Sequence, residues 1–394
     1  MLDVAALASF SAACSIAPEP VESALEVALP AGPLLGSEEP HAANRRTVAA
    51  RFTERVWQSA QGRSNRWYVP AELAFTLDLF PPWFLRVFAT ALGLLWGSFL
   101  NVVIHRVPRG MSVVRPPSHC PKCQQPIRAW QNVPLFGWLF LRGRSACCGE
   151  RISIRYPLVE LIGGVLALAI VELTILPLPA PTTSFPFALA LFASSLTLAL
   201  GLVATAFIDT EHLQILPDRA NAVGALLGVA TASLRGLSWV DCLIGGAVGF
   251  ALGFGIDSVY RMLRGRSGFA SGDTVLLVVM GSWFGWLGAA FGLVAGAVQG
   301  TLIIIAVRVF GGAVAEPEAV KREREEIRAE IEKLPESERG RAMAEWRAED
   351  ELADEPGEGM QAPLPFGPFI AMAGIELLLF GPTLQDLFFL WTAP

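Results

Sequence analysis

Charged residues are scarce in this sequence. They make up 17% of its 394 residues, against 53% hydrophobic residues, and the mean hydropathy is +0.48. Soluble globular domains carry about 25% charged residues, so the composition excludes an ordinary soluble enzyme. It is the composition of a polytopic membrane protein, and we expect an all-α fold built from membrane-spanning helices.

We also expect no secretory signal peptide in the first residues of this sequence. The first residues, Met1-Leu-Asp-Val, have no basic region, and the apolar stretch that ends at Cys14 matches a lipoprotein signal only weakly. The next residues are rich first in Pro and Glu (18–40) and then in Arg (45–66). We therefore predict a disordered N-terminal extension over residues 1–82. A start codon assigned too far upstream would produce the same pattern.

Cysteines are few and unevenly placed. Of the six, four lie between Cys120 and Cys148. Their clustering in a loop that we predict to be cytoplasmic indicates a metal site or reduced thiols rather than a disulfide framework. No glycine-rich nucleotide-binding motif is present, and we expect no nucleic acid among the partners.

Long apolar runs, in contrast, are abundant. Hydropathy predicts eight transmembrane helices of about 17–25 residues. They are Phe84–Ile104, Leu158–Leu176, Phe187–Ile208, Ala220–Leu234, Cys242–Tyr260, Thr274–Ala290, Leu293–Phe310 and Phe366–Trp391. The fourth, sixth and seventh are short and rich in Gly and Ala, residues that let helices pack closely.

Loop charge orients these helices. The loop from His105 to Tyr156 carries nine Arg or Lys residues and one acidic residue, Glu150. The positive-inside rule places this loop in the cytoplasm, where its charge would also attract anionic lipid. By alternation, the loops that hold Asp209 and Asp273 are cytoplasmic too. The two aspartates therefore lie on one face of the membrane.

We accordingly expect six segments along the chain. They are the extension 1–82, a first transmembrane helix 83–104, a basic cysteine-containing cytoplasmic domain 105–156, a transmembrane core 157–310, a charged cytoplasmic insertion 311–364 and a last transmembrane helix 365–394. Within the insertion, Glu323–Lys333 has the composition of a solvated helix, which Pro335 would end.

Asp209 and Asp273 are the candidate catalytic residues, because each lies at the boundary of an apolar run, where burying a carboxyl group is costly. Two carboxyl groups held together can hydrolyse a peptide bond: one accepts a proton from water and the other donates a proton to the carbonyl or the leaving amine. Which aspartate does which cannot be read from the sequence, since a coupled pair titrates as a unit. The alternatives are an ion pathway or plain interfacial residues, with Asp273 as the N-cap of the helix that follows.

The cysteines predict a zinc site. Cys120-Pro-Lys-Cys123 is half of a tetrahedral thiolate site, and the adjacent Cys147 and Cys148 are the candidates for the other half. Adjacent cysteines point in different directions, so joint ligation requires an unusual turn, and His119 is an alternative ligand. Four protein ligands leave no open position for water, so the zinc would be structural. The alternative is a compact loop with reduced thiols.

Six motifs follow one another in a fixed order. They are Gly97–Pro108, Cys120–Cys123, Ile152–Glu160, Asp209–Asp218, Gly272-Asp273 and Pro365–Phe369. In this order they resemble the bacterial type IV prepilin peptidases, a family of GxGD-type intramembrane aspartic peptidases. The resemblance covers roughly residues 84–310 and the last span, and it implies that Asp209 and Asp273 are the catalytic pair.

The resemblance also implies the setting and the reaction. It implies a multi-pass enzyme of the bacterial inner membrane whose active site faces the cytoplasm. Such an enzyme removes the leader peptide from prepilins and pseudopilins, and commonly also methylates the new N-terminus with S-adenosylmethionine. The expected partners are these substrates, from a type IV pilus or a type II secretion system, and membrane lipid. The residues that would bind the cofactor are not identified by the motifs.

The chain departs from the family pattern at three positions. Ala270 replaces the first glycine of the glycine-x-glycine-aspartate motif, Val275 replaces a lysine, and Ser145 stands where the second cysteine pair begins. The first two changes leave an inactive homologue as an alternative. The rival function is a catalytically silent membrane scaffold or assembly factor of a pilus or type II secretion system. A transporter would predict internal repeats and carboxylates near mid-span, and neither is evident.

Overall fold

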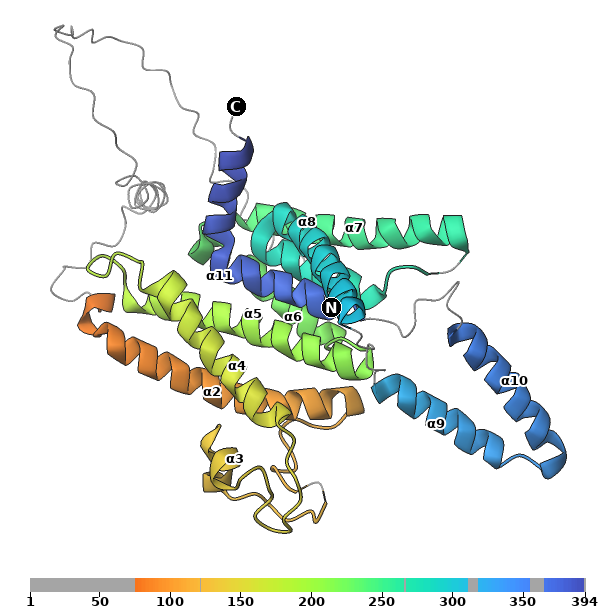
Figure 1. Ribbon diagram of the computed structural model, residues 1–394. Coiled ribbons are helices and arrows are strands. Elements are labelled where there is room, and N and C mark those ends of the chain that lie inside the picture. Colours follow the sequence, from red (N-terminus) through yellow and green to blue (C-terminus); the bar gives the residue numbers. More distant parts are fainter. Residues whose placement is uncertain (1–74, 121, 266, 311–317, 355–364, 393–394) are drawn as a thin grey trace, which may run out of the picture. The chain divides into compact units, whose positions relative to one another are not determined.

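The computed structural model describes residues 75–120, 122–265, 267–310, 318–354 and 365–392 (Figure 1). Within these ranges the chain is helical, and its β-pairing is limited to isolated bridges. The predicted all-α fold is therefore confirmed. The longer helices are α2 (Pro82–Arg106), α4 (Arg155–Ile170), α5 (Phe185–His212), α6 (Asp218–Ala230), α7 (Trp239–Arg264), α8 (Ser271–Val309), α9 (Glu318–Glu332), α10 (Glu336–Asp354) and α11 (Gly367–Thr392).

Short helical turns precede α2 and connect the longer helices. They are η3 (Leu77–Leu79), η4 (Val107–Arg109), η5 (Ala129–Asn132), α3 (Phe136–Phe140), the π-helical η6 (Val171–Ile175) and η7 (Ala232–Arg235). The η6 turn continues α4 directly, so the two together form one apolar helix.

Among the residues that the structure describes, five helices are long and apolar enough to cross a membrane. They are Pro82–Arg109, Arg155–Ile175, Phe185–His212, Trp239–Arg264 and Ser271–Val309. A shorter apolar helix covers Gly367–Gly381. By length and composition, the chain is a multi-pass membrane protein, as predicted.

The predicted count of eight spans is met only in part. Four predicted spans coincide with α2, α4 with η6, α5 and α7, and the eighth lies in α11. The fourth corresponds to α6, whose 13 residues fall short of the roughly 20 that a bilayer requires. The sixth and seventh both fall within α8. The count of eight stays a prediction.

A bend at Gly285 divides α8, which is 39 residues long. Gly285 has a φ of 73°, a left-handed conformation that glycine adopts without a steric penalty. A Cβ on Gly292 would lie 3.4 Å from Cγ of Met280, whereas a straight helix would separate two residues twelve positions apart by about 18 Å. The chain therefore turns back on itself at Gly285, which lies within the predicted sixth span rather than between the sixth and the seventh.

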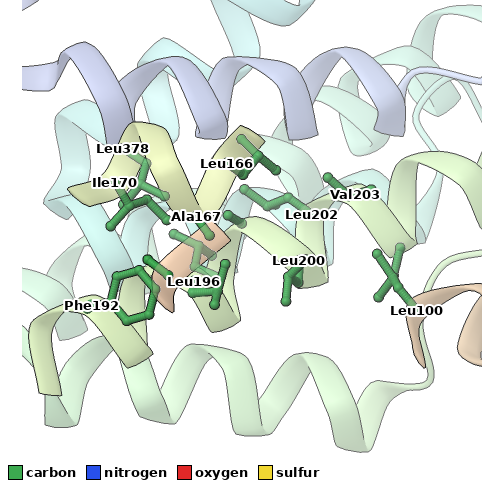
Figure 2. Close-up of a cluster of buried hydrophobic side chains, with 14 of the residues drawn as sticks. Leu100, Leu166, Ala167, Ile170, Phe192, Leu196, Leu200, Leu202, Val203 and Leu378 are labelled. Atoms are coloured by element: carbon green, nitrogen blue, oxygen red, sulfur yellow. The ribbon is translucent and has the colours of Figure 1, made fainter. Parts of the chain in front are cut away.

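The hydrophobic core joins helices from both ends of the chain. Figure 2 shows apolar side chains of α5 meeting those of α4 and of α11. The labelled members include Ala167 and Ile170 of α4, Phe192 and Leu196 of α5, and Leu378 of α11. Because α11 packs on both α5 and α8, this core fixes the three helices that carry the candidate site.

Helices α7 and α8 approach each other through glycines at four-residue spacing. Gly245 and Gly249 lie on one face of α7, and both are buried. A Cβ on Gly245 would meet the carbonyl oxygen of Gly281, and a Cβ on Gly249 would meet that of Leu277. Small residues at this spacing allow helix backbones to pack closely within a membrane. The contact fixes the position of the first half of α8, which carries Asp273 in its first turn.

We expect Gly249→Leu to destabilise the protein by about 1–3 kcal/mol, because the new side chain must push α8 away. Gly255→Leu is the matched control, since an added Cβ on that glycine of the same helix would have no atom within 4 Å. The midpoint of thermal denaturation in detergent would be lowered by the first change and left near the parent value by the second. Equal midpoints for the two variants would refute the close packing.

Two predicted segments are described only in part. Residues 1–74 of the extension lie outside the described residues, while Leu77 is buried and its N–H donates to the carbonyl of Thr183 at 3.0 Å. Of the insertion, residues 311–317 and 355–364 lie outside. The predicted helix Glu323–Lys333 corresponds to α9, and Pro335 separates α9 from α10. The division of the chain into six segments stays a prediction.

Candidate active site

Asp209 lies in the last turn of α5, and its side chain is 8% exposed. The helix ends just beyond it because Leu213 is left-handed (φ 50°) and donates its N–H to the Asp209 carbonyl at 2.9 Å. Pro217 then serves as the N-cap of α6. The helix therefore does not run on into α6, and the carboxyl group of Asp209 lies at a helix end.

Asp273 lies in the first turn of α8 and is 7% exposed. Its helix is capped by Ala270, so the interpretation of Asp273 as the N-cap is wrong. A carboxyl group in the first turn is nonetheless favoured by the partial positive charge of the helix N-terminus. The position is therefore suited to a buried acidic side chain.

The structure brings the two aspartates together. A Cβ added to Gly367 would contact both Oδ2 of Asp209 and Cδ1 of Leu276, which lies one turn beyond Asp273 in α8, so the ends of α5 and α8 that carry the aspartates lie side by side. Next to them, Gly272 faces the loop after α5, where an added Cβ would lie only 2.9 Å from Cγ2 of Ile215. The glycine before Asp273 thus leaves room for the loop that follows Asp209.

The start of α11 closes the site from the other end of the chain. The backbone N–H of Gly367 donates to the Asp209 carboxylate, and a Cβ on this glycine would collide with Oδ2 of Asp209. Beside it, the rings of Phe366 and Phe269 meet edge to face, with centroids 5.9 Å apart. Sequence reasoning gave Gly367 no role, although its motif, Pro365-Phe-Gly-Pro-Phe369, was a signal.

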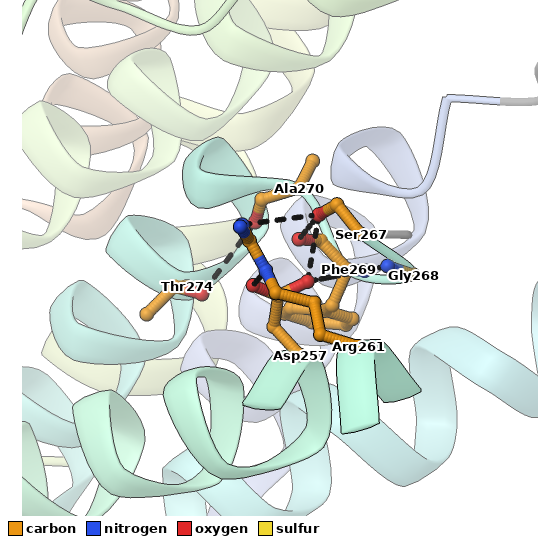
Figure 3. A network of polar contacts seen from close by, with 7 residues as sticks. All are labelled: Asp257, Arg261, Ser267, Gly268, Phe269, Ala270 and Thr274. Carbon is orange, nitrogen blue, oxygen red and sulfur yellow. Dashed lines mark hydrogen bonds and ion pairs between the residues drawn. The ribbon is translucent and has the colours of Figure 1, made fainter. Parts of the chain in front are cut away.

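The loop that leads into Asp273 is held by Asp257 of α7 (Figure 3). Oδ1 of Asp257 accepts hydrogen bonds from the Ser267 hydroxyl at 2.7 Å and from the backbone N–H groups of Gly268 and Phe269 at 3.2 and 3.3 Å. Its Oδ2 accepts from Nε of Arg261 at 2.6 Å. Sequence reasoning missed this anchor; the only local signal is the acidic and basic pair four residues apart on one helix.

The cysteine loop contains two turns of the same design. In the first, the Cys120 carbonyl accepts from the N–H of Gln124 at 2.9 Å. In the second, the Ser145 carbonyl accepts from the N–H of Gly149 at 2.9 Å. Ser145 therefore holds the place that Cys120 has in the first turn. An ion pair between Lys122 and Glu150, one residue from each turn, joins the turns and lowers the pKa of the Glu150 carboxyl.

All four predicted metal ligands come together in this loop. The sulfur atoms of Cys120, Cys123, Cys147 and Cys148 lie within 4.8 Å of one another. Cys120 and Cys148 are 3.6 Å apart, and Cys123 and Cys147 are 3.1 Å apart. A tetrahedral zinc with bonds of about 2.3 Å separates its sulfur ligands by about 3.8 Å, so this donor set fits the metal.

The surroundings of the cluster also suit a cation. Hydrogen bonds from the backbone N–H of Cys123 and from the Ser145 hydroxyl lower the pKa of the Cys120 thiol to about 6, and a thiolate is the form that binds metal. His119 bonds through Nδ1 to the Pro117 carbonyl at 3.0 Å and is not a member of the cluster. The adjacent cysteines, not the histidine, complete the set of four.

Comparison with known proteins gives matches in two parts of the chain. Residues 91–173 match the bacterial peptidase A24 N-terminal domain, and residues 196–305 match the type IV leader peptidase family. These ranges include Cys120–Cys148, Asp209 and Asp273. No solved structure matches the chain.

Several curated relatives are similar over most of their length. A protein of Myxococcus xanthus, named prepilin leader peptidase/N-methyltransferase, is 35% identical over 318 residues, which are 76% of this chain and 91% of the relative. A protein of the same name from Stutzerimonas stutzeri is 31% identical over 322 residues, which cover 74% of this chain and 90% of the relative. One from Neisseria gonorrhoeae is 35% identical over 222 residues, covering 50% and 73%. The chain therefore belongs to the type IV leader peptidase family, and it is an enzyme.

Proposed function

We propose that the chain is a membrane aspartic endopeptidase that removes the leader peptide from type IV prepilins and pseudopilins, and that it also methylates the new N-terminus. The observation that carries the proposal is the meeting of Asp209 and Asp273, from two helices, in one buried site. The names of the relatives supply the substrate class and the methyl transfer.

The pair can perform the hydrolysis as follows. Two buried carboxyl groups close together do not both ionise readily, so they share one proton. The ionised member takes a proton from a water molecule, which attacks the scissile carbonyl. The protonated member donates its proton to the developing oxyanion, and the pair then returns a proton to the leaving amine. Acid and base are properties of the pair rather than of one residue.

We further propose that the enzyme lies in the bacterial inner membrane with eight crossings and its site on the cytoplasmic face. The basic loop 105–156 supports this orientation. A basic leader remains on the cytoplasmic side, and the apolar segment after it enters the bilayer next to α5 and α8. The scissile bond then lies at the depth of the two aspartates, which are at helix ends.

Two nonprotein groups belong to this proposal. The four clustered cysteines would hold a structural zinc, because four thiolates leave no coordination position open for water or substrate. S-Adenosylmethionine would supply the methyl group when bound. Hydrolysis requires neither, since the aspartates provide both proton transfers.

Zinc content tests the cysteine cluster. We expect Cys147→Ser to weaken zinc retention by about tenfold or more, because a hydroxyl is a poor substitute for a thiolate ligand. Cys242→Ser is the control, since this buried cysteine lies outside the cluster. Elemental analysis after dialysis against a graded series of chelator concentrations measures both. Equal zinc in Cys147→Ser and the parent would remove Cys147 from the ligand set.

Mass spectrometry of a prepilin product tests the function. The purified chain in lipid should shorten the substrate at the leader junction and, with S-adenosylmethionine added, attach a methyl group to the new N-terminus. An uncut substrate, with the protein folded and lipid present, would favour the silent scaffold. Leader removal by the variants Ala270→Gly and Val275→Lys would then show whether these two departures from the family pattern cause the loss of peptidase activity.

A further inference from the structure

Two buried nitrogen atoms without a hydrogen-bond partner lie at the cytoplasmic ends of α4 and α5. They are Nε of Arg155 and Nε2 of His212. His212 is 7% exposed and follows Asp209 by three residues, so both side chains project from the same side of α5. Buried polar groups are normally paired, and these two donors therefore point to a ligand.

More nitrogen donors surround these two atoms. His105, at the end of α2, interacts electrostatically with Arg155 and Arg109, and His212 interacts with the same two arginines and with Arg322 of α9. Arg109 donates through NH1 to the His105 carbonyl at 2.6 Å, and its side chain is otherwise open to solvent. Three helix ends thus direct cationic and imidazole groups to one place beside the aspartate pair.

A carboxylate lies among these groups. Glu211 accepts from NH1 of Arg155, and its Oε2 is 3.9 Å from Nε2 of His212. A phosphate dianion would be repelled by this residue. An α-amino acid group, in contrast, matches both the positive and the negative side chains here. Its carboxylate can pair with arginine or imidazole, and its ammonium group can pair with glutamate.

We propose that His105, Arg109, Arg155, Glu211 and His212, here called the His212 cluster, bind the α-amino-acid end of S-adenosylmethionine. This inference rests on the methyl-transfer part of the proposed function. The new amino terminus forms at Asp209, one helical turn from His212, so a methyl donor held by the cluster lies next to its acceptor. In the reaction, the neutral amine nitrogen bonds to the methyl carbon as the carbon–sulfur bond breaks, and sulfur keeps the electron pair to give S-adenosylhomocysteine.

Two probes and three variants test this placement by binding rather than by turnover. S-Adenosylhomocysteine carries the amino-acid end, whereas 5′-methylthioadenosine has the same nucleoside and sulfur without it. Calorimetric titration of the full chain in lipid nanodiscs gives the dissociation constant of each. We expect Arg109→Gln and His212→Gln to weaken S-adenosylhomocysteine by about tenfold or more, as loss of a charged hydrogen bond predicts, and to leave methylthioadenosine unchanged. Arg115→Gln, an exposed arginine of the same basic loop, should alter neither.

The outcomes separate this inference from the rest of the proposal. Parent-like binding of S-adenosylhomocysteine by Arg109→Gln, or an equal loss for both probes, would overturn it. The inference would also be overturned if anionic lipid in the nanodisc abolished the binding of S-adenosylhomocysteine, because the cluster would then hold a lipid headgroup. A parent that removes leaders but does not bind S-adenosylhomocysteine refutes the methyl-donor site and leaves the peptidase standing. A parent that binds the probe but leaves the substrate uncut counts only against the peptidase.

Discussion

Asp209→Asn and Asp273→Asn are each expected to reduce leader removal by roughly 10⁴-fold, the upper range for loss of a general acid or base. An amide can neither accept the proton of the attacking water nor donate one to the leaving amine. Because the two groups act as a unit, the double variant should be no slower than either single one. Both side chains are buried at helix ends, so an amide at either position leaves the site with one of its two buried carboxyl groups.

The measurement is the single-turnover rate of prepilin shortening, followed by mass spectrometry. Asp241→Asn is the matched control, because Asp241 also lies in the first turn of a spanning helix but is exposed. It should cleave at the parent rate. A rate within tenfold of the parent in either Asp209→Asn or Asp273→Asn would exclude the aspartate pair as the source of hydrolysis.

Gly367→Ala is expected to lower the cleavage rate by about 10²-fold, the size of effect that follows a displacement of about 1 Å at a reacting group. The new methyl group would occupy the place of Oδ2 of Asp209. Either the aspartate or the start of α11 must therefore move, and the hydrogen bond from the Gly367 N–H would be lost. The effect acts through the position of Asp209, so it should appear mainly in the rate at saturating substrate.

Gly381→Ala provides the comparison for this second prediction. It lies in the same helix, and a Cβ added there would have no atom within 4 Å. Cleavage rate and thermal midpoint are measured for both variants. Should Gly367→Ala cleave at the parent rate, the contact between α11 and Asp209 does not constrain the site.

The sequence predicted the helices whose apolar runs are long and uninterrupted, such as α2, α5 and α7. It could not predict the bend in α8 because local sequence does not single out Gly285 among 37 glycines. The turn there depends on the packing of the two halves of the helix against each other. The number of membrane crossings could not be predicted from the sequence either. The 13 residues of α6 are fewer than a span requires, and hydropathy alone does not show whether this helix crosses the membrane.

The sequence predicted those parts of the candidate site in which an acidic residue lies at the end of a long apolar run. Asp209 and Asp273 stand at the ends of apolar runs, and loop charge put them on one face. Gly367 could not be assigned this way, because its contact with Asp209 joins segments far apart in the chain. Asp257 contacts the nearby residues 267–269, but the sequence alone does not show that the loop folds back onto its carboxylate. His212 could have been suspected, since an imidazole one turn beyond a candidate catalytic aspartate shares its helix face.

The pair of matching turns around the cysteines bears on how such chains are found. In the second turn, Ser145 stands in the position that Cys120 has in the first turn. Cys147, next to Cys148, contributes the fourth sulfur atom of the cluster instead. A pattern search that demands two C-x-x-C pairs passes over this arrangement, although four sulfur atoms still gather around one point. Homologues that lack the second pair should therefore be sorted by the number of thiols that the fold can gather, not by their spacing along the chain.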